Sequence, residues 1–159
     1  MKTRPAFLAA LLSVSMYNAQ AQNVPHPPHA HAAPDDRVVL ELTPDERAMI
    51  LEEMRMFLSG VQQMTGALGR QDMPAAAEAA RGLGQKMVHE VPPALRAKLP
   101  TGFRQLGFSV HREFDQIALD ADTLKDASHT LNQLSATLQK CVACHTTYQI
   151  QSPMFHTEH

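Results

Sequence analysis

The segment Cys141-Val142-Ala143-Cys144-His145 constrains this chain more than any other part of its sequence. Its pattern, C-x-x-C-H, is the pattern by which c-type haem is attached to proteins. Each cysteine sulfur adds to one vinyl group of the macrocycle, so the two cysteines must lie about one helical turn apart. His145 follows Cys141 by 4 positions, which on a helix places its imidazole on the same face. The segment therefore predicts one covalent haem c on Cys141 and Cys144, with His145 binding the iron.

Two other interpretations of the cysteines are weaker. A redox-active C-x-x-C pair usually belongs to a βαβ unit, and no strand-like alternation of apolar residues flanks Cys141 and Cys144. A zinc site commonly needs a second C-x-x-C or an H-x-x-x-H element, whereas the whole chain contains 2 cysteines. Haem attachment is the interpretation that the residues favour.

Residues 1–21 are typical of a secretory signal peptide. Lys2 and Arg4 precede a short apolar run, and Ala19-Gln20-Ala21 has the small-x-small pattern of a cleavage site. The apolar run is shorter than the roughly 20 residues that a membrane-spanning helix needs. We therefore expect a soluble, periplasmic protein with no membrane span. Export also supports haem attachment, because haem c is added outside the cytoplasm.

Residues 22–42 are rich in proline, histidine and alanine, a composition that predicts a flexible leader of polyproline character. His26, His29 and His31 could bind a divalent metal weakly, although a solvated linker is the commoner outcome for such a tract. Residues 43–150 are expected to form one domain, followed by a tail at 151–159. The net charge of −2 becomes more negative when Lys2 and Arg4 are removed, which argues against a nucleic-acid partner.

Helical patterns begin at residue 43 and predict an all-α fold. Thr43-Pro44-Asp45-Glu46 combines an N-cap threonine, a proline in the first turn and a glutamate that completes a capping box. Apolar residues at spacings of three and four follow, and Gly69 and Asp72 mark the end of this helix. The inward face is expected to carry Ile50, Met54, Phe57, Leu58, Val61, Thr65 and Leu68.

Three further helices are expected. The second extends from Met73 to His89, and prolines bracket a short turn at 94–99. The third extends from Thr101 to about Ala121, and Thr123 with Asp126 is spaced as a capping box for the fourth. Short loops between four helices favour an antiparallel four-helix bundle with the haem near its C-terminus. The inward stripe of the fourth helix is expected to be Leu124, Ala127, Leu131, Leu134, Leu138, Cys141 and His145.

A C-x-x-C-H segment on the last helix of such a bundle, followed by Tyr148, resembles the class II c-type cytochromes, the cytochrome c′ family. The resemblance spans about residues 43–150, and its specific part is Cys141, Cys144, His145 and Tyr148. It implies an up-down-up-down four-helix bundle, often a homodimer, with a residue of the first helix facing the open side of the iron. That residue is apolar in five-coordinate members and methionine in six-coordinate members. Gln149 stands where many members have a basic residue, which favours the six-coordinate branch.

Geometry favours Met54 as the sixth ligand. In an antiparallel bundle the end of the fourth helix lies beside the start of the first. Met64 is about 30 Å along the helix from Pro44 at 1.5 Å per residue, which is too far. Met54 is about half as far and lies on the inward stripe, whereas Met49 and Met56 share the charged side of the helix.

Other side chains could contribute to the haem site. A guanidinium matches a carboxylate in bidentate fashion, and His111 is an alternative iron ligand on the third helix. The arginines expected to pair with the haem propionates are Arg55, Arg104 and Arg112.

These features predict a monohaem electron carrier with His145 as the proximal and Met54 as the distal ligand. Its partners would be redox proteins, and a homodimer is compatible with the sequence. If Leu58 or Val61 covers the iron instead, the protein would bind small gases such as NO or CO. An enzymatic role is not expected, because the sequence offers no set of acid-base residues on the distal side.

Overall fold

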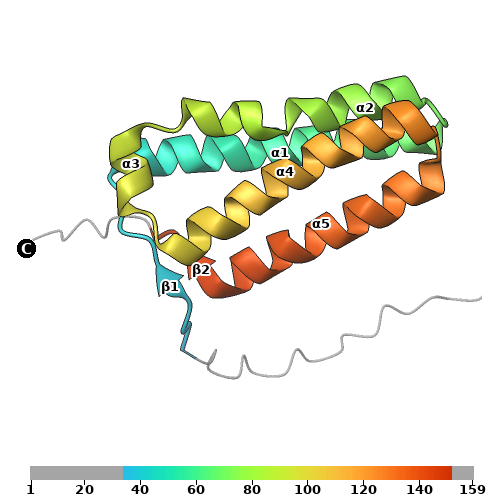
Figure 1. The fold of residues 1–159 in the computed structure, drawn as a ribbon. Coiled ribbons are helices and arrows are strands. Elements are labelled where there is room, and N and C mark those ends of the chain that lie inside the picture. Colours follow the sequence, from blue (N-terminus) through green and yellow to red (C-terminus); the bar gives the residue numbers. More distant parts are fainter. Residues whose placement is uncertain (1–33, 152–159) are drawn as a thin grey trace, which may run out of the picture. The chain divides into compact units, whose positions relative to one another are not determined.

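A computed structural model describes residues 34–151, and of these the side chains of 88–90 are left out. The predicted signal peptide, the histidines of the leader and the tail beyond residue 151 lie outside this part of the chain. The described part is mainly α-helical, as predicted, and none of its helices is long and apolar enough to span a bilayer. Its elements are β1 (Val38–Val39), α1 (Pro44–Gly69), α2 (Met73–Gly82), the 3₁₀ segment η1 (Gln85–Glu90), α3 (Pro93–Lys98), α4 (Thr101–Leu124), α5 (Ala127–Thr147) and β2 (Tyr148–Gln149) (Figure 1).

The first two long helices begin where the sequence predicts. The Thr43 hydroxyl accepts a hydrogen bond from the Glu46 N–H at 3.3 Å, and the Glu46 carboxylate accepts one from the Thr43 N–H at 2.9 Å. This reciprocal pair satisfies two N–H groups that would otherwise lack partners at the helix end. Asp72 similarly accepts a hydrogen bond from the N–H of Ala75 at 3.2 Å and caps α2. Both predicted caps are confirmed.

Helix α2 is shorter than predicted, because the chain turns at Gly82 instead of continuing to residue 89. Asp115 of α4 stabilises the chain after this turn by accepting a hydrogen bond from the Gln85 N–H at 3.1 Å. Gly84 makes the approach possible, since a Cβ at this position would lie 1.8 Å from an oxygen of Asp115. The residues that follow form the 3₁₀ turn η1.

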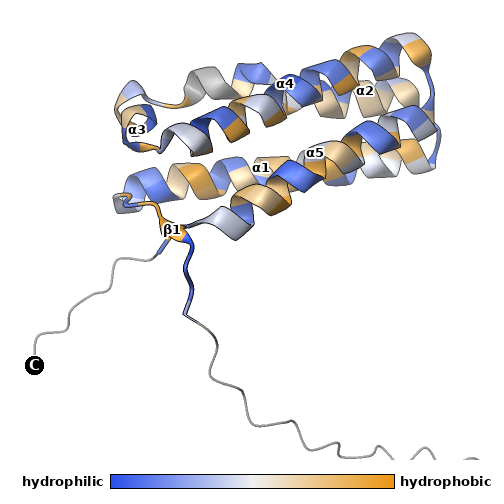
Figure 2. Ribbon diagram, turned by 60° about the horizontal axis from the view of Figure 1, so that its bottom comes forward, coloured by the Kyte–Doolittle hydropathy of each residue, from blue (hydrophilic) through white to orange (hydrophobic). Residues whose placement is uncertain are grey.

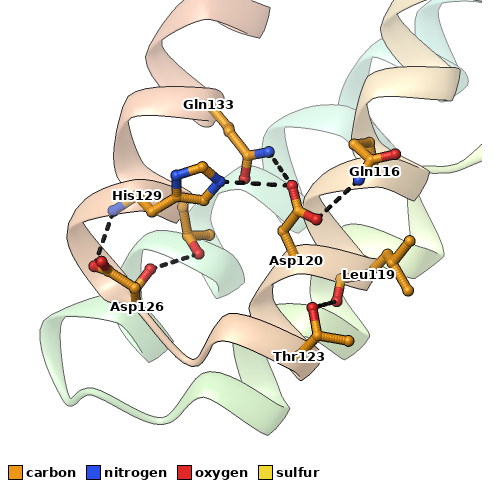
Figure 3. Close-up of polar contacts among 8 residues, drawn as sticks. Gln116, Leu119, Asp120, Thr123, Asp126, His129 and Gln133 are labelled. Atoms are coloured by element: carbon orange, nitrogen blue, oxygen red, sulfur yellow. Dashed lines mark hydrogen bonds and ion pairs between the residues drawn. The ribbon is translucent and has the colours of Figure 1, made fainter.

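The junction of α4 and α5 differs in detail from the predicted capping box (Figure 3). Asp126 alone caps α5, by accepting hydrogen bonds from two N–H groups of its first turn at 2.9 and 3.0 Å. Thr123 belongs to α4, where its hydroxyl donates to the Leu119 carbonyl at 2.9 Å. Helix α4 extends to Leu124, and Lys125 reverses the chain with a positive φ of 53°. The prediction that Thr123 caps α5 is therefore wrong.

A polar cluster centred on Asp120 joins α4 to α5 near this turn (Figure 3). The Asp120 carboxylate accepts hydrogen bonds from Gln133 at 2.5 Å and from Gln116 at 2.8 Å. It also lies 3.5 Å from the half-exposed imidazole of His129. The hydrogen bond from Gln133, helped by Gln116 and His129 and opposed by partial burial, lowers the pKa of Asp120.

The main core lies among the long helices, with α1 packed on α2, α2 on α4 and α4 on α5 (Figures 1 and 2). Ala76, Ala77 and Ala80 of α2 are fully buried. Their small side chains allow α1 and α4 to pack closely against α2. Phe114 and Met64 are also fully buried and are the largest side chains of this core.

The inward face of α5 is not the predicted leucine stripe. Leu134 is 1% exposed as predicted, but Leu131 and Leu138 are 52% and 36% exposed. Thr130 and Thr137 lie inward instead, and the hydroxyl of each donates to the backbone carbonyl four residues earlier. Because these hydroxyls are satisfied within the helix, the two threonines can be buried at little cost.

The ends of the described chain meet in the parallel pair β1–β2. Its register pairs Val38 with Tyr148, and the Leu40 N–H donates to the Gln149 carbonyl at 2.8 Å. Leu40 is 5% exposed and packs with Ile50 and residues of α3 in a second, smaller core. The segment therefore packs on the helical domain, although the sequence predicts it as part of a flexible leader. Strands of two residues are too short to show an alternating pattern.

Two glycines of α1 provide a matched test of the packing between α1 and α2. A Cβ at Gly60 would lie 2.6 to 2.7 Å from three carbons of the buried Leu83, whereas a Cβ at Gly66 would meet only Arg70 at 3.5 Å. We expect Gly60→Ala to lower the free energy of unfolding by about 1–3 kcal/mol through overpacking. Gly66→Ala should raise it by up to about 1 kcal/mol through helix propensity. Denaturant unfolding followed by circular dichroism measures both, and equal effects of the two substitutions would contradict the packing described.

Candidate functional site

A hollow of about 260 Å³ lies between the first turns of α1 and the last turns of α5. Figure 2 shows β1 at the same end of the domain as these turns. We call it the His145 hollow. Its walls are mostly apolar, and its lining residues are Arg37, Leu40, Ile50, Leu51, Met54, Phe103, Cys144, His145, Tyr148, Gln149 and Ile150.

The C-x-x-C-H segment occupies the last turns of α5. Cys144 and His145 line the hollow, and Cys141 lies one turn earlier, half-buried, with its sulfur 3.9 Å from the Thr137 carbonyl. Both thiols are free, so no disulfide blocks them. The His145 side chain is exposed at the mouth of the hollow. The prediction that His145 points into the helical core is therefore wrong, because the core-facing positions of α5 end with Thr137.

The environment of the two thiols does not suit a redox-active dithiol. Burial raises the pKa of Cys141, with a further contribution from the nearby carboxylate of Glu113. Burial also raises the pKa of Cys144, and the neighbouring Cys141 adds to the shift. Reactive dithiols instead have a lowered pKa, commonly at a helix N-terminus, whereas these cysteines lie near the C-terminus of α5.

Helix α1 supplies the facing wall of the His145 hollow. Met54 and Leu51 both line it, three positions apart on one face of the helix. Met64 lies in the main core. Met49 and Met56 line a different hollow on another side of α1. Among the described methionines, Met54 is therefore the one that the structure brings to the same hollow as His145.

The apolar alternatives named from the sequence do not line this hollow. Leu58 is 72% exposed, and Val61 packs against the main core. Leu51 is the apolar α1 side chain beside Met54 in the hollow. The prediction that Leu58 and Thr65 belong to the inward face of α1 is wrong, because both are exposed, whereas Val61 is partly buried as expected.

Tyr148 and Phe103 close the hollow at the start of α4. Their rings meet edge to face, with centroids 5.3 Å apart and planes at 85°. Gly102 allows this contact, because a Cβ there would lie 2.8 Å from the Tyr148 hydroxyl oxygen. The aromatic residue that follows the C-x-x-C-H segment is thus held against the first turn of α4.

The arginines predicted to pair with propionates lie elsewhere. Arg55, Arg104 and Arg112 are exposed and do not line the hollow. Arg37 lines it instead, and its guanidinium donates to the His145 carbonyl at 3.1 Å. Arg47 lies one turn before Leu51 on α1, and its buried Nε has no hydrogen-bond partner among the described residues. The sequence did not identify Arg37 as a site residue, because Arg37 lies in the predicted leader.

His111 is a structural residue of the main domain and not an iron ligand. Its side chain is 4% exposed, with Nδ1 2.8 Å from the Leu83 carbonyl and Nε2 3.1 Å from the Glu53 carboxylate. Both ring nitrogens are therefore occupied. Burial alone would lower the pKa of His111, but the hydrogen bonds with Glu53 and Leu83 outweigh it and raise the pKa.

No protein-family model, curated protein or solved structure matches this chain. What the His145 hollow binds is therefore inferred from its own residues. Among residues 34–151, no three His, Cys, Asp or Glu side chains lie close enough to hold a bare metal ion. Iron carried in a macrocycle needs only axial ligands from the protein, and the imidazole of His145 and the thioether of Met54 suit that role. Cys144 lines the hollow and Cys141 lies one turn earlier, which is the spacing that covalent haem attachment needs.

His111 provides a pH-dependent test of this geometry. Because its folded-state pKa is raised, the stabilisation is fully present below the unfolded-state pKa and is lost as the pH rises through the folded-state pKa. We expect the stability difference between wild type and His111→Gln to decrease over that range. Urea unfolding of both proteins at several pH values measures it, and the other histidines cancel in the comparison. A pH-independent difference would contradict the hydrogen-bonded imidazolium.

Proposed function

We propose that this protein is a periplasmic monohaem c-type cytochrome that carries single electrons. In this proposal α1, α2, α4 and α5 form an antiparallel four-helix bundle resembling the class II cytochromes. The observation that carries the proposal is that Met54 of α1 lines one hollow with Cys144 and His145 of α5. Met54 and His145 lie on the first and last long helices of the described chain, so their shared hollow depends on the tertiary fold.

Each residue would have a distinct role. Cys141 and Cys144 would hold haem c through thioether bonds, and His145 and Met54 would be its axial ligands. The haem supplies the one-electron redox chemistry. Histidine and methionine together favour the reduced state relative to two nitrogen ligands and so raise the reduction potential. The imidazole and thioether are both neutral, so neither ligand needs to exchange a proton when an electron arrives.

The surroundings of the hollow support this role. The walls formed by Leu40, Ile50 and Phe103 exclude water from the side of the site away from its mouth. Arg37 would pair with a propionate at this wall. Arg47 does not line the hollow, but its buried Nε has no hydrogen-bond partner among residues 34–151. An unpaired buried donor is costly, so an anionic group beside Arg47 would be stabilising.

A second function remains consistent with the hollow. Leu51 lines it together with Met54, so an apolar side chain is available to cover the distal side. The protein would then keep a five-coordinate iron and bind small gases such as NO or CO. The two functions differ in which of these α1 side chains approaches the iron.

The distal ligand can be identified with two methionine variants of α1. We expect Met54→Ala to convert a low-spin, six-coordinate visible spectrum into a high-spin one and to lower the reduction potential. The loss of the thioether leaves the iron with His145 as its only protein ligand. Met56→Ala is the matched control, because Met56 lies two positions away but outside the His145 hollow.

Other outcomes are equally informative. A Met54→Ala protein with an unchanged spectrum would exclude Met54 as a ligand. Rapid CO binding by the reduced wild-type protein would then support the five-coordinate alternative, and enlarging Leu51 to phenylalanine should weaken that binding.

A further inference from the structure

The methionines of α1 and η1 that lie outside the core and the His145 hollow gather at one place. Met64 and Met73 are buried in the main core, and Met54 lines the His145 hollow. The remaining methionines among the described residues, Met49, Met56 and Met87, line one hollow of about 220 Å³. We call this the methionine hollow.

The three side chains come from two segments and are open to solvent. Met49 and Met56 lie two helical turns apart on one face of α1 and are 41% and 40% exposed. Met87 belongs to η1 and is half-buried against the main core. Methionine is unbranched and has three rotatable bonds, so the thioethers that line this hollow can adjust their positions around a ligand.

The other polar groups of the methionine hollow are already engaged. Glu52 forms an ion pair with Arg55 at 2.5 Å, and Glu53 accepts a hydrogen bond from His111 at 3.1 Å. The hollow also contains apolar residues of the segment before α3 and of α3 itself, including Val91 and Leu95. The available donors are therefore three neutral sulfurs in a largely apolar setting.

We propose that the methionine hollow is a binding site for a soft monovalent cation, Cu(I), held by the thioethers of Met49, Met56 and Met87. Thioether sulfur is a soft ligand that selects Cu(I), whereas Ca²⁺ and Mg²⁺ require oxygen ligands. Zinc would require imidazole, thiolate or carboxylate, and no cluster of three such groups exists within residues 34–151. Three neutral ligands also leave only the single positive charge of the cation in the hollow.

The site is independent of the proposed haem ligands. Met49 and Met56 do not line the His145 hollow, and Met54 does not line the methionine hollow. Occupation of one site therefore requires no ligand of the other. The cation would be bound as Cu(I) and released as Cu(I), so no electron is transferred in the binding step.

The site can be tested with Ag(I), a redox-inert substitute for Cu(I), on the mature, haem-loaded protein. With ¹³C-methyl methionine labelling, we expect one equivalent of Ag(I) to shift the signals of Met49, Met56 and Met87. The signals of the buried Met64 and Met73 should stay in place. Competition with a Cu(I) chelator then measures the affinity for Cu(I) itself.

Methionine-to-leucine variants keep the volume of the side chain and remove its sulfur. Removing a residue that only hydrogen-bonds to a metal ligand typically lowers metal affinity about 10-fold or more. Removing the ligand itself, as in Met56→Leu, should therefore lower the affinity for Cu(I) by at least this factor. The triple variant of Met49, Met56 and Met87 should lose the site. Met64→Leu, in the core, is the matched control and should bind as wild type does.

Two further controls separate other sources of soft-metal binding. Alanine at His26, His29 and His31 removes the leader imidazoles and should leave the site intact. If the cysteines prove to carry no haem, alkylating them first removes the competing thiols, and the experiment still applies. The proposal is overturned if the triple leucine variant binds Cu(I) as tightly as wild type, or if the Met49, Met56 and Met87 signals do not respond to Ag(I).

Discussion

The contact between the two ends of the described chain is the constraint on which the site depends. The pairing of β1 with β2 is reinforced by the Arg37 guanidinium, which donates to the His145 carbonyl at 3.1 Å. Gln149 returns a hydrogen bond from its side chain to the Arg37 carbonyl at 3.1 Å. Burial of Leu40 beside this pair adds about 1.5–3 kcal/mol of hydrophobic stabilisation. Without these contacts, the last turn of α5 and the first turns of α1 would not form one hollow.

Local features of the fold were predictable because local chemistry determines them. Thr43 and Asp72 cap helices through hydrogen bonds to residues three positions away, so short sequence patterns identify them. The helical spacing of Cys141, Cys144 and His145 and the position of Met54 on α1 were predictable for the same reason. The early end of α2 was not, because the chain after it is stabilised by Asp115, which is 30 residues from its partner Gln85.

The spacing of apolar residues did not predict which side chains of α5 are buried near the site. A count of apolar residues assigns Leu131 and Leu138 to the core, yet Thr130 and Thr137 are buried because their hydroxyls bond within the helix. This rotation of α5 carries His145 to the mouth of its hollow. Arg37 could not be found from the sequence, because its place at the site follows from strand pairing across the whole domain.

Helix α1 organises both hollows because its faces carry different methionines. Met54 points to the His145 hollow, and Met49 with Met56 lines the methionine hollow. Between them, Glu53 holds the buried His111 of α4. Helix α1 is therefore held to the core by the contact between Glu53 and His111 and by its buried apolar face. Its two other sides line the His145 hollow and the methionine hollow.

The proposed haem attachment is tested most directly by the mass and colour of the purified protein. The protein should be produced with residues 1–21 in place, in cells that mature c-type cytochromes, and compared with a Cys141→Ala, Cys144→Ala variant. We expect a coloured wild-type protein whose mass, measured after denaturation, exceeds that of the polypeptide by one haem, and a variant without this addition. A colourless wild-type protein with the mass of the bare polypeptide, while a control cytochrome in the same cells carries haem, would contradict it.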